Sequence, residues 1–145
     1  MKNSNYNFVQ WSSPEELHED CLQWISKLKF IKDEQGFLND LIKNHTLEML
    51  SEDLYKSATH FISQLQKEEK EVEKLLQKVE NHCKGLKILL DGIDEIREEK
   101  SYKEVHYYRK MEVTLFEQEY QKTKKEIFNL IKNIMRKDSM KLLTE

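Results

Sequence analysis

Residues 54–86 read LYKSATHFISQLQKEEKEVEKLLQKVENHCKGL, and this stretch decides the fold. Apolar residues recur in it at alternating spacings of four and three from Leu54 to Leu86, with charged residues between them. That spacing places one apolar stripe along one side of an α-helix. Two polar side chains, Glu68 and His82, interrupt the stripe. The stretch therefore predicts a long amphipathic helix with two polar positions on its apolar face.

The segment before this stretch contains a matching helix start. Ser13 is a good N-cap residue, Pro14 suits the first helical position, and Glu16 completes a capping box with Ser13. Apolar residues then recur with the same heptad spacing, and Gln35 is one of two polar interruptions. We expect a first helix from about residue 14 to residue 46.

A third heptad pattern follows a second capping box at Ser101 and Glu104. Short turns between consecutive helices make neighbouring helices antiparallel. The predicted fold is all-α, a single domain of residues 1–145 that forms an elongated antiparallel three-helix bundle. We expect its helices at about residues 14–46, 52–97 and 102–141, preceded by a short N-terminal arm of residues 1–12. This architecture resembles spectrin-like three-helix bundles, a resemblance at the level of the fold that carries no function.

The composition agrees with long helices and disfavours several classes of protein. The chain has 3 glycines and 1 proline, and 35% of its residues are charged. The net charge is −3, from 24 basic and 27 acidic side chains, whereas a nucleic-acid-binding protein usually has a basic surplus. No apolar run is long enough for a signal peptide or a membrane span. We therefore expect a cytoplasmic protein that binds neither nucleic acid nor membrane.

The three heptad patterns can be aligned with one another if the helices are antiparallel. A residue of the first helix then faces the residue of the second helix for which the two residue numbers sum to about 103. For the second and third helices, the sum of the two residue numbers is about 198–199. This alignment predicts two layers with polar side chains: Cys21 with His82 and Phe116, and Gln35 with Glu68 and Leu130.

Cys21 and His82 form the first candidate site. A cysteine beside a histidine can be an activated nucleophile or half of a metal site. We favour a structural interpretation, because cysteine also behaves as a small core hydrophobe and no third ligand is evident in that layer. Cys83 follows His82 directly, so their side chains diverge by roughly 100° around the helix and cannot converge on one atom. The two cysteines fit free thiols in a reducing compartment.

Gln35 and Glu68 form a second polar layer inside the predicted bundle. A polar residue in the apolar stripe can fix the register of packed helices, as in coiled coils. A buried glutamate without a partner destabilises a fold, so we expect this one to be paired, protonated or placed at the bundle edge. The alternative is a functional carboxylate.

One end of the predicted bundle carries a polar and aromatic patch. The second and third helices are expected to run several turns past the start of the first, which leaves an overhang with His106 and Arg109. The N-terminal arm, which includes Trp11, is placed to fold back over this overhang. A partner chain or a ligand that covers the patch is the alternative. In this alignment His106 shares no layer with another histidine.

Sequence motifs for enzymatic chemistry are missing. A dimetal carboxylate bundle needs Glu-x-x-His on two helices, and this chain has only one such motif, from Glu15 to His18. The chain contains no Cys-x-x-Cys pair for zinc and no glycine-rich nucleotide-binding loop. We therefore expect a protein that is not an enzyme, with no catalytic residue, no cofactor and no metal.

Some apolar residues lie outside the heptad stripes. Phe30 and Phe37, seven residues apart on one outer face of the first helix, suggest an association surface. The third helix has a further stripe at Phe128, Ile131 and Met135, and a wide packing face accounts for Ile131. The sequence thus favours a non-enzymatic interaction or scaffold protein that self-associates, and its expected partner is a second copy in a homodimer or another helical protein. The alternative is a helical bundle that binds a small ligand or a metal ion.

Overall fold

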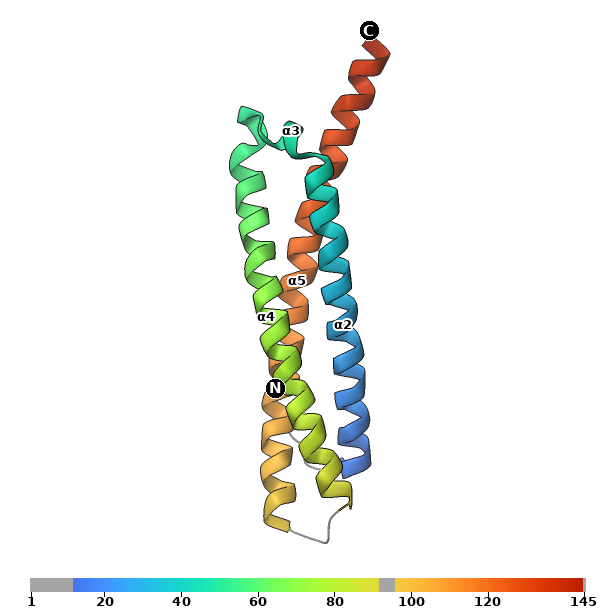
Figure 1. The fold of residues 1–145 in the computed structure, drawn as a ribbon, viewed down its shortest axis with the longest axis vertical. Helices are drawn as coiled ribbons and strands as arrows, with labels where there is room; N and C mark the ends of the chain where they lie inside the picture. Colours follow the sequence, from blue (N-terminus) through green and yellow to red (C-terminus); the bar gives the residue numbers. More distant parts are fainter. Residues whose placement is uncertain (1–11, 92–95, 145) are drawn as a thin grey trace. The chain divides into compact units, whose positions relative to one another are not determined.

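The computed structural model describes residues 12–91 and 96–144, and all the regular secondary structure in them is helical. The long helices are α2 (Pro14–Asn44), α4 (Glu52–Asp91) and α5 (Ile96–Thr144), and the short helix α3 (Thr46–Met49) lies between the first two in the sequence (Figure 1). The prediction of an all-α protein is therefore confirmed.

The first residues of α2 explain where this helix begins. The Ser13 hydroxyl accepts a hydrogen bond from the Glu16 N–H at 3.2 Å, and the Ser13 N–H donates to the Glu16 carboxylate at 3.1 Å. Pro14 is the first helical residue, where the missing N–H of proline removes no helical hydrogen bond. The predicted capping box is thus confirmed in both directions.

The connection between α4 and α5 comes earlier than the sequence pattern predicts. α4 ends at Asp91, directly before Gly92, and does not reach residue 97. α5 begins at Ile96 and not at residue 102. The letters REEK that follow Ile96 are good helix formers, so the helix includes them without waiting for the expected cap. Both predicted helix ends are therefore wrong.

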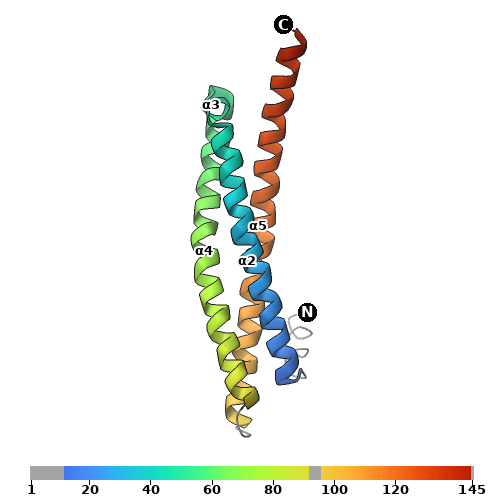
Figure 2. The ribbon, with the colours of Figure 1, turned by 45° about the vertical axis from the view of Figure 1, so that its right-hand side comes forward.

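The chain forms two compact units, and each contains segments of all three long helices. The first unit consists of Met1–Ile31 and Val72–Phe116, and the second of Lys32–Glu71 and Glu117–Glu145. In the second unit the C-terminal turns of α5 continue beyond the adjoining ends of α2 and α4, as Figures 1 and 2 both show.

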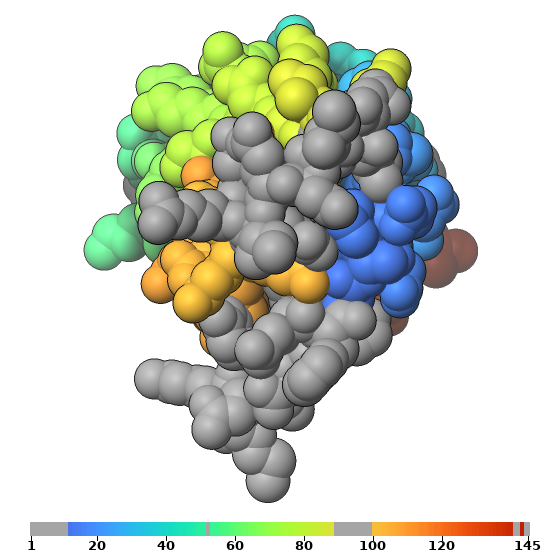
Figure 3. Space-filling model, turned by 90° about the horizontal axis from the view of Figure 1, so that it is seen from below, coloured from blue at the N-terminus to red at the C-terminus, as the bar shows by residue number. Residues whose placement is uncertain are grey.

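Each unit buries side chains at the positions that the heptad pattern predicts. In the first unit the buried apolar positions include Leu17, Cys21, Leu28, Val72, Val79, Leu86 and Val113. In the second unit they include Leu38, Ala58, Leu65, Tyr120, Ile127 and Ile134. Burial of one leucine or valine side chain stabilises a folded protein by about 1.5–3 kcal/mol. Figure 3 shows the first unit from below, with surface atoms of α2 (blue) beside those of α5 (orange).

The neighbours of α4 on α5 differ from the predicted ones. The sequence alignment predicts Phe116 beside His82, but Nε2 of His82 lies 2.9 Å from Nδ1 of His106. This neighbour comes earlier along α5 because the connection from α4 to α5 comes earlier. The predicted layer of Cys21, His82 and Phe116 is therefore wrong in its third member.

Candidate functional site

The second unit has an open groove lined by residues of α2 and α5. The groove has a volume of about 700 Å³, and six of its nine lining residues are apolar. Its apolar side chains are Phe37 and Leu41 from α2, and Phe128, Ile131, Met135 and Met140 from α5. A groove of this size and lining can receive the apolar side chains of a ligand or of a partner helix.

Most of these apolar side chains reach solvent. Phe37 is 55% exposed and Met135 is 56% exposed, and Phe128 and Met140 are exposed as well. Ile131 is buried and forms the floor of the groove. Aromatic side chains and methionine are enriched at protein interfaces, where methionine adapts its shape to a partner. The exposed lining therefore has the composition of an association surface.

The remaining side chains of the groove give it a positive charge. Lys132 and Arg136 line it and lie four residues apart on α5, so they project from neighbouring positions of the same helix face. Ser139 adds a hydroxyl group. Among the described residues, no acidic side chain lines the groove. The groove thus combines an apolar floor with a cationic rim.

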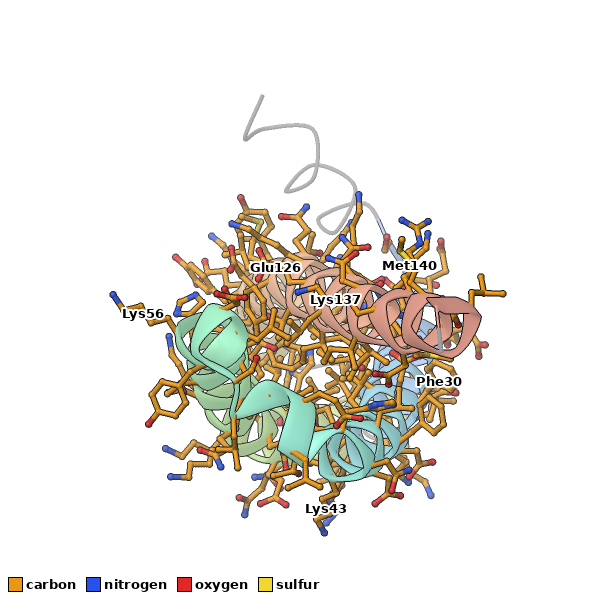
Figure 4. The ribbon with its side chains drawn as sticks, turned by 90° about the horizontal axis from the view of Figure 1, so that it is seen from above. Phe30, Lys43, Lys56, Glu126, Lys137 and Met140 are labelled. Atoms are coloured by element: carbon orange, nitrogen blue, oxygen red, sulfur yellow. The ribbon has the colours of Figure 1, made fainter. Side chains whose placement is uncertain are left out.

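Phe30 and Phe37 are the residues that the sequence assigns to an association surface. Phe30 is 65% exposed and points away from α2, as Figure 4 shows. It belongs to the first unit and is not part of the groove lining, whereas Phe37 belongs to the second unit and lines the groove. The structure thus leaves both phenylalanines exposed and places one of them in the groove.

The first unit contains a buried cluster of Cys21 from α2, His82 from α4 and His106 from α5. The Sγ of Cys21 and one ring nitrogen of each histidine all lie within 4.8 Å of one another. Nδ1 of His106 is 2.9 Å from Nε2 of His82 and 3.8 Å from Sγ of Cys21. Cys21 and His82 therefore lie close together, as the sequence alignment predicts. A third polar residue, His106, lies beside them, and the alignment does not place it there.

His106 lies at the centre of this cluster. Its other ring nitrogen, Nε2, is 3.2 Å from Oδ2 of Asp20, and its ring stacks on Trp24 with the centroids 4.5 Å apart. Because a carboxylate accepts hydrogen bonds, Nε2 carries the proton and Nδ1 presents a lone pair toward Cys21 and His82. The predicted position of His106 in an overhang covered by the N-terminal arm is wrong, since the earlier start of α5 carries this residue between the three long helices, beside Cys21 and His82.

Burial keeps the groups of the cluster uncharged at neutral pH. Desolvation lowers the pKa of His82 to about 4, and repulsion from protonated His106 and from Arg109 acts in the same direction. Desolvation also lowers the pKa of His106 to about 4, with a smaller contribution from Lys110. Burial raises the pKa of the Cys21 thiol well above its usual range. Two neutral imidazoles and one neutral thiol therefore face one another.

The second cysteine lies close to the first. Cys21 and Cys83 are buried, free cysteines, and each thiol shifts the pKa of the other. Cys83 is nevertheless not among the three groups whose donor atoms converge. This arrangement agrees with the expected divergence of His82 and Cys83 around α4.

Gln35 and Glu68 are both buried in the second unit. Oε1 of Glu68 accepts hydrogen bonds from the Thr123 hydroxyl at 2.7 Å and from Nε2 of Gln64 at 3.1 Å. Oε2 of Glu68 and Nε2 of Gln35 have no hydrogen-bond partner among the described residues. Thr123 takes the place that the alignment gives to Leu130, so the predicted layer is wrong at that position. Burial of the two polar residues does not by itself assign them a function.

The other members of the predicted bundle-end patch do not form a site in the described residues. Arg109 is partly exposed and forms an ion pair with Glu112, three residues later on the same helix. Trp11 and the rest of the predicted arm up to that residue lie outside the described part of the chain. His106 is therefore buried and not part of a patch at the bundle end. The ion pair of Arg109 with Glu112 is of the kind that neighbouring residues on a helix surface commonly form.

No protein family model, curated protein or solved structure matches this chain. Within the described residues, no helix has an apolar stretch long enough to cross a lipid bilayer. The function is therefore inferred from the groove and the buried cluster themselves.

Proposed function

We propose that this chain is a non-enzymatic interaction protein, folded as an antiparallel three-helix bundle, that binds an acidic amphipathic helix in the groove of its second unit. The exposed apolar lining with a cationic rim supports this proposal most directly. An amphipathic helix places apolar side chains at positions i, i+3 or i+4, and i+7 into such a groove. Glutamate or aspartate beside those positions would pair with Lys132 and Arg136.

A second copy of the chain is the other candidate occupant of the groove. In a two-fold symmetric dimer, the same surface patch of both copies meets at the interface. Lys132 and Arg136 of one copy would then lie close to the same cations of the other copy, and like charges repel. The charge of the groove therefore favours an acidic partner over self-association.

The first test compares two labelled helical peptides with the same leucines at helical spacing. In one peptide the flanking positions are glutamate, and in the other they are lysine. We expect the glutamate peptide to bind at least tenfold more tightly, a difference of about 1.4 kcal/mol in binding free energy. Because exposed charges are screened by salt, this preference should shrink at high ionic strength. Equal affinities of the two peptides, measured by fluorescence anisotropy, would contradict the proposed charge complementarity.

The two exposed phenylalanines of α2 provide a matched pair of variants. Phe37→Asp puts a negative charge into the groove lining and should abolish binding of the glutamate peptide, whereas Phe30→Asp should leave it unchanged. Both side chains are solvent-exposed, so both variants should keep the helical content of the wild type. Sedimentation of the three proteins tests the other occupant. If the wild type is a dimer, and Phe37→Asp dissociates it whereas Phe30→Asp does not, then the occupant of the groove is a second copy of the chain and not an acidic helix.

A further inference from the structure

The buried cluster of the first unit shares no residue with the groove and supports an inference beyond the proposed function. We propose that Cys21, His82 and His106 bind a divalent transition metal ion, and that this ion is Zn²⁺. The donor atoms come from three helices and converge within 4.8 Å, although the residues lie far apart in the sequence. A thiol and two imidazoles are groups that zinc binds preferentially in proteins.

Two of the three distances between the donor atoms are close to those of a tetrahedral zinc site. With Zn–N bonds of about 2.0–2.1 Å and a Zn–S bond of about 2.3 Å, the two nitrogens would be about 3.3 Å apart, and the sulfur would be about 3.6 Å from a nitrogen. The structure has 2.9 Å between the two histidine nitrogens and 3.8 Å between Sγ of Cys21 and Nδ1 of His106. The third distance, between Sγ of Cys21 and the His82 nitrogen, is at most 4.8 Å, against about 3.6 Å in a tetrahedral site, so these two side chains would move closer together by up to about 1.2 Å when the ion binds.

Asp20 and Trp24 orient the central ligand. A histidine that binds a metal usually donates its other ring N–H to a carboxylate, which fixes the tautomer and the direction of the ring. Nε2 of His106 makes this contact with Asp20 at 3.2 Å, and the stacked Trp24 ring holds the imidazole from one face. His106 is thus held with its free lone pair directed at the other two donors. Asp20 is a positioning residue in this arrangement.

Two hydrogen-bond donors face one lone pair at the centre of the cluster, although the Cys21 thiol also has Cys83 as a hydrogen-bond partner. The Cys21 thiol and Nε2 of His82 both face the single lone pair on Nδ1 of His106, which cannot accept two full hydrogen bonds. Nδ1 of His82 is buried without a hydrogen-bond partner among the described residues, and it would stay so with the ion bound at Nε2. An ion bound by all three donors would satisfy each lone pair that faces the centre of the cluster.

Zinc binding to this cluster releases one proton. The S–H bond of Cys21 breaks, a bond from sulfur to zinc forms, and the proton goes to solvent. On His82 the proton moves from Nε2 to Nδ1, so that Nε2 presents its lone pair to the ion. The charge balances, since a dication binds and one proton leaves. Cys83 lies outside the converging donors, which leaves the fourth ligand position to a water molecule.

The experiment uses the full-length protein, kept reduced and stripped of metal with a chelator, and Co²⁺ as a spectroscopic probe for the zinc site. One equivalent of Co²⁺ should produce a thiolate-to-cobalt charge-transfer band and the visible bands of tetrahedral cobalt, and one equivalent of Zn²⁺ should abolish both. Zn²⁺ should also raise the thermal unfolding temperature, because an ion that binds only the folded state stabilises it. A reduced, helical sample that shows neither the bands nor the thermal shift would overturn the proposal.

The two buried cysteines give a matched pair of variants for the ligand assignment. Cys21→Ala should lose the charge-transfer band, whereas Cys83→Ala should keep it at full intensity. A band that Cys83→Ala halves would overturn the assignment of a single thiolate. Because Cys21 is fully buried, the circular dichroism of each variant is measured first to show that it has folded.

A second pair of variants keeps the test independent of the cysteines. His106→Gln should lower the affinity for Co²⁺ at least a hundredfold, whereas His60→Gln, at an exposed position of α4, should not change it. Asp20→Asn should weaken Co²⁺ binding about 10–100-fold while the cobalt bands and the unfolding temperature of the metal-free protein stay the same. Unchanged affinity in His106→Gln would overturn the proposed ligand set.

Discussion

Glu68 is a buried carboxyl group of the second unit with only one of its oxygens hydrogen-bonded to described residues. Desolvation raises its pKa above the ordinary value, and the negative charges of Glu71 and Glu119 act in the same direction. Hydrogen bonds from Thr123 and Gln64 lower the pKa but do not outweigh desolvation. The ionised form of Glu68 therefore destabilises the folded state relative to the unfolded chain.

We predict that Glu68→Gln stabilises the protein by about 1 kcal/mol at neutral pH and has a much smaller effect near pH 4. The folded-state pKa is raised, so at low pH both states keep the proton and the contribution of Glu68 is fully present. As the pH rises above the ordinary value of 4.5, the unfolded chain ionises first and stability is lost. Glutamine keeps the shape and does not titrate. Urea unfolding of both proteins across this pH range measures the difference, and a difference that does not change with pH would contradict the prediction.

Gly36 and Gly85 are helical glycines without positive φ, but their surroundings differ. A Cβ at Gly36 would meet no atom within 4 Å, whereas a Cβ at Gly85 would collide with the ring of Tyr102. Alanine favours a helix over glycine by up to about 1 kcal/mol. We predict that Gly36→Ala stabilises the protein by about 0.5–1 kcal/mol and that Gly85→Ala destabilises it by about 1–2 kcal/mol in thermal unfolding. In a Tyr102→Ala background, Gly85→Ala should become stabilising, and a persistent loss would show that the ring is not the cause.

At the scale of the helix, the N-terminus of α2 depends on its cap. The Ser13 hydroxyl satisfies the N–H of Glu16, which has no partner within the helix. We predict that Ser13→Ala lowers the free energy of unfolding by about 1 kcal/mol. Ser26→Ala, at an exposed position inside α2, should change it by less than about 0.5 kcal/mol, because alanine is a good helix former. Chemical denaturation of both variants checks this, and equal effects would mean that the cap is not what stabilises the helix start.

The heptad spacing predicts which side chains of each helix are buried, but it does not predict their neighbours. A pattern that repeats every seven residues looks the same after a shift of seven, so only the position of the turn fixes which layers meet. Gly92 was a signal for the end of α4, and the helix-forming residues after Ile96 were a signal for an early start of α5. Neither signal is strong alone. Because the turn was predicted too late in the sequence, the alignment of α5 with α4 was shifted, and His106 was not predicted to lie beside Cys21 and His82.

The groove was predictable in its parts and not as a whole. The outward position of Phe37 and the extra stripe at Phe128, Ile131 and Met135 follow from helical spacing alone. Which helices meet, and at what level, depends on the packing of side chains from distant parts of the sequence. The groove forms because Phe37 and Leu41 of α2 lie beside Met135 of α5. The sequence pattern of a single helix does not predict which residues of another helix lie beside it.

At the scale of the whole molecule, the two proposed sites belong to different units. The groove is lined by residues of the second unit, and the three proposed zinc ligands are residues of the first. The two sites also differ in chemistry. The groove of the second unit is an apolar surface with two cations, and the cluster of the first unit offers neutral nitrogen and sulfur donors. No described residue takes part in both sites.

We therefore predict that zinc and the acidic peptide bind independently. Saturation with Zn²⁺ should change the Kd of the glutamate peptide by less than about twofold, and the peptide should change the affinity for Co²⁺ equally little, because coupling requires two states that both ligands distinguish. Among amides that exchange by local opening, Zn²⁺ should slow hydrogen exchange around Cys21, His82 and His106, and the peptide should slow it around Phe37 and Met135. Binding coupling is reciprocal, so an equal tenfold change in both affinities would contradict independence. That result would mean that the helices common to both units have two arrangements, each favoured by one ligand.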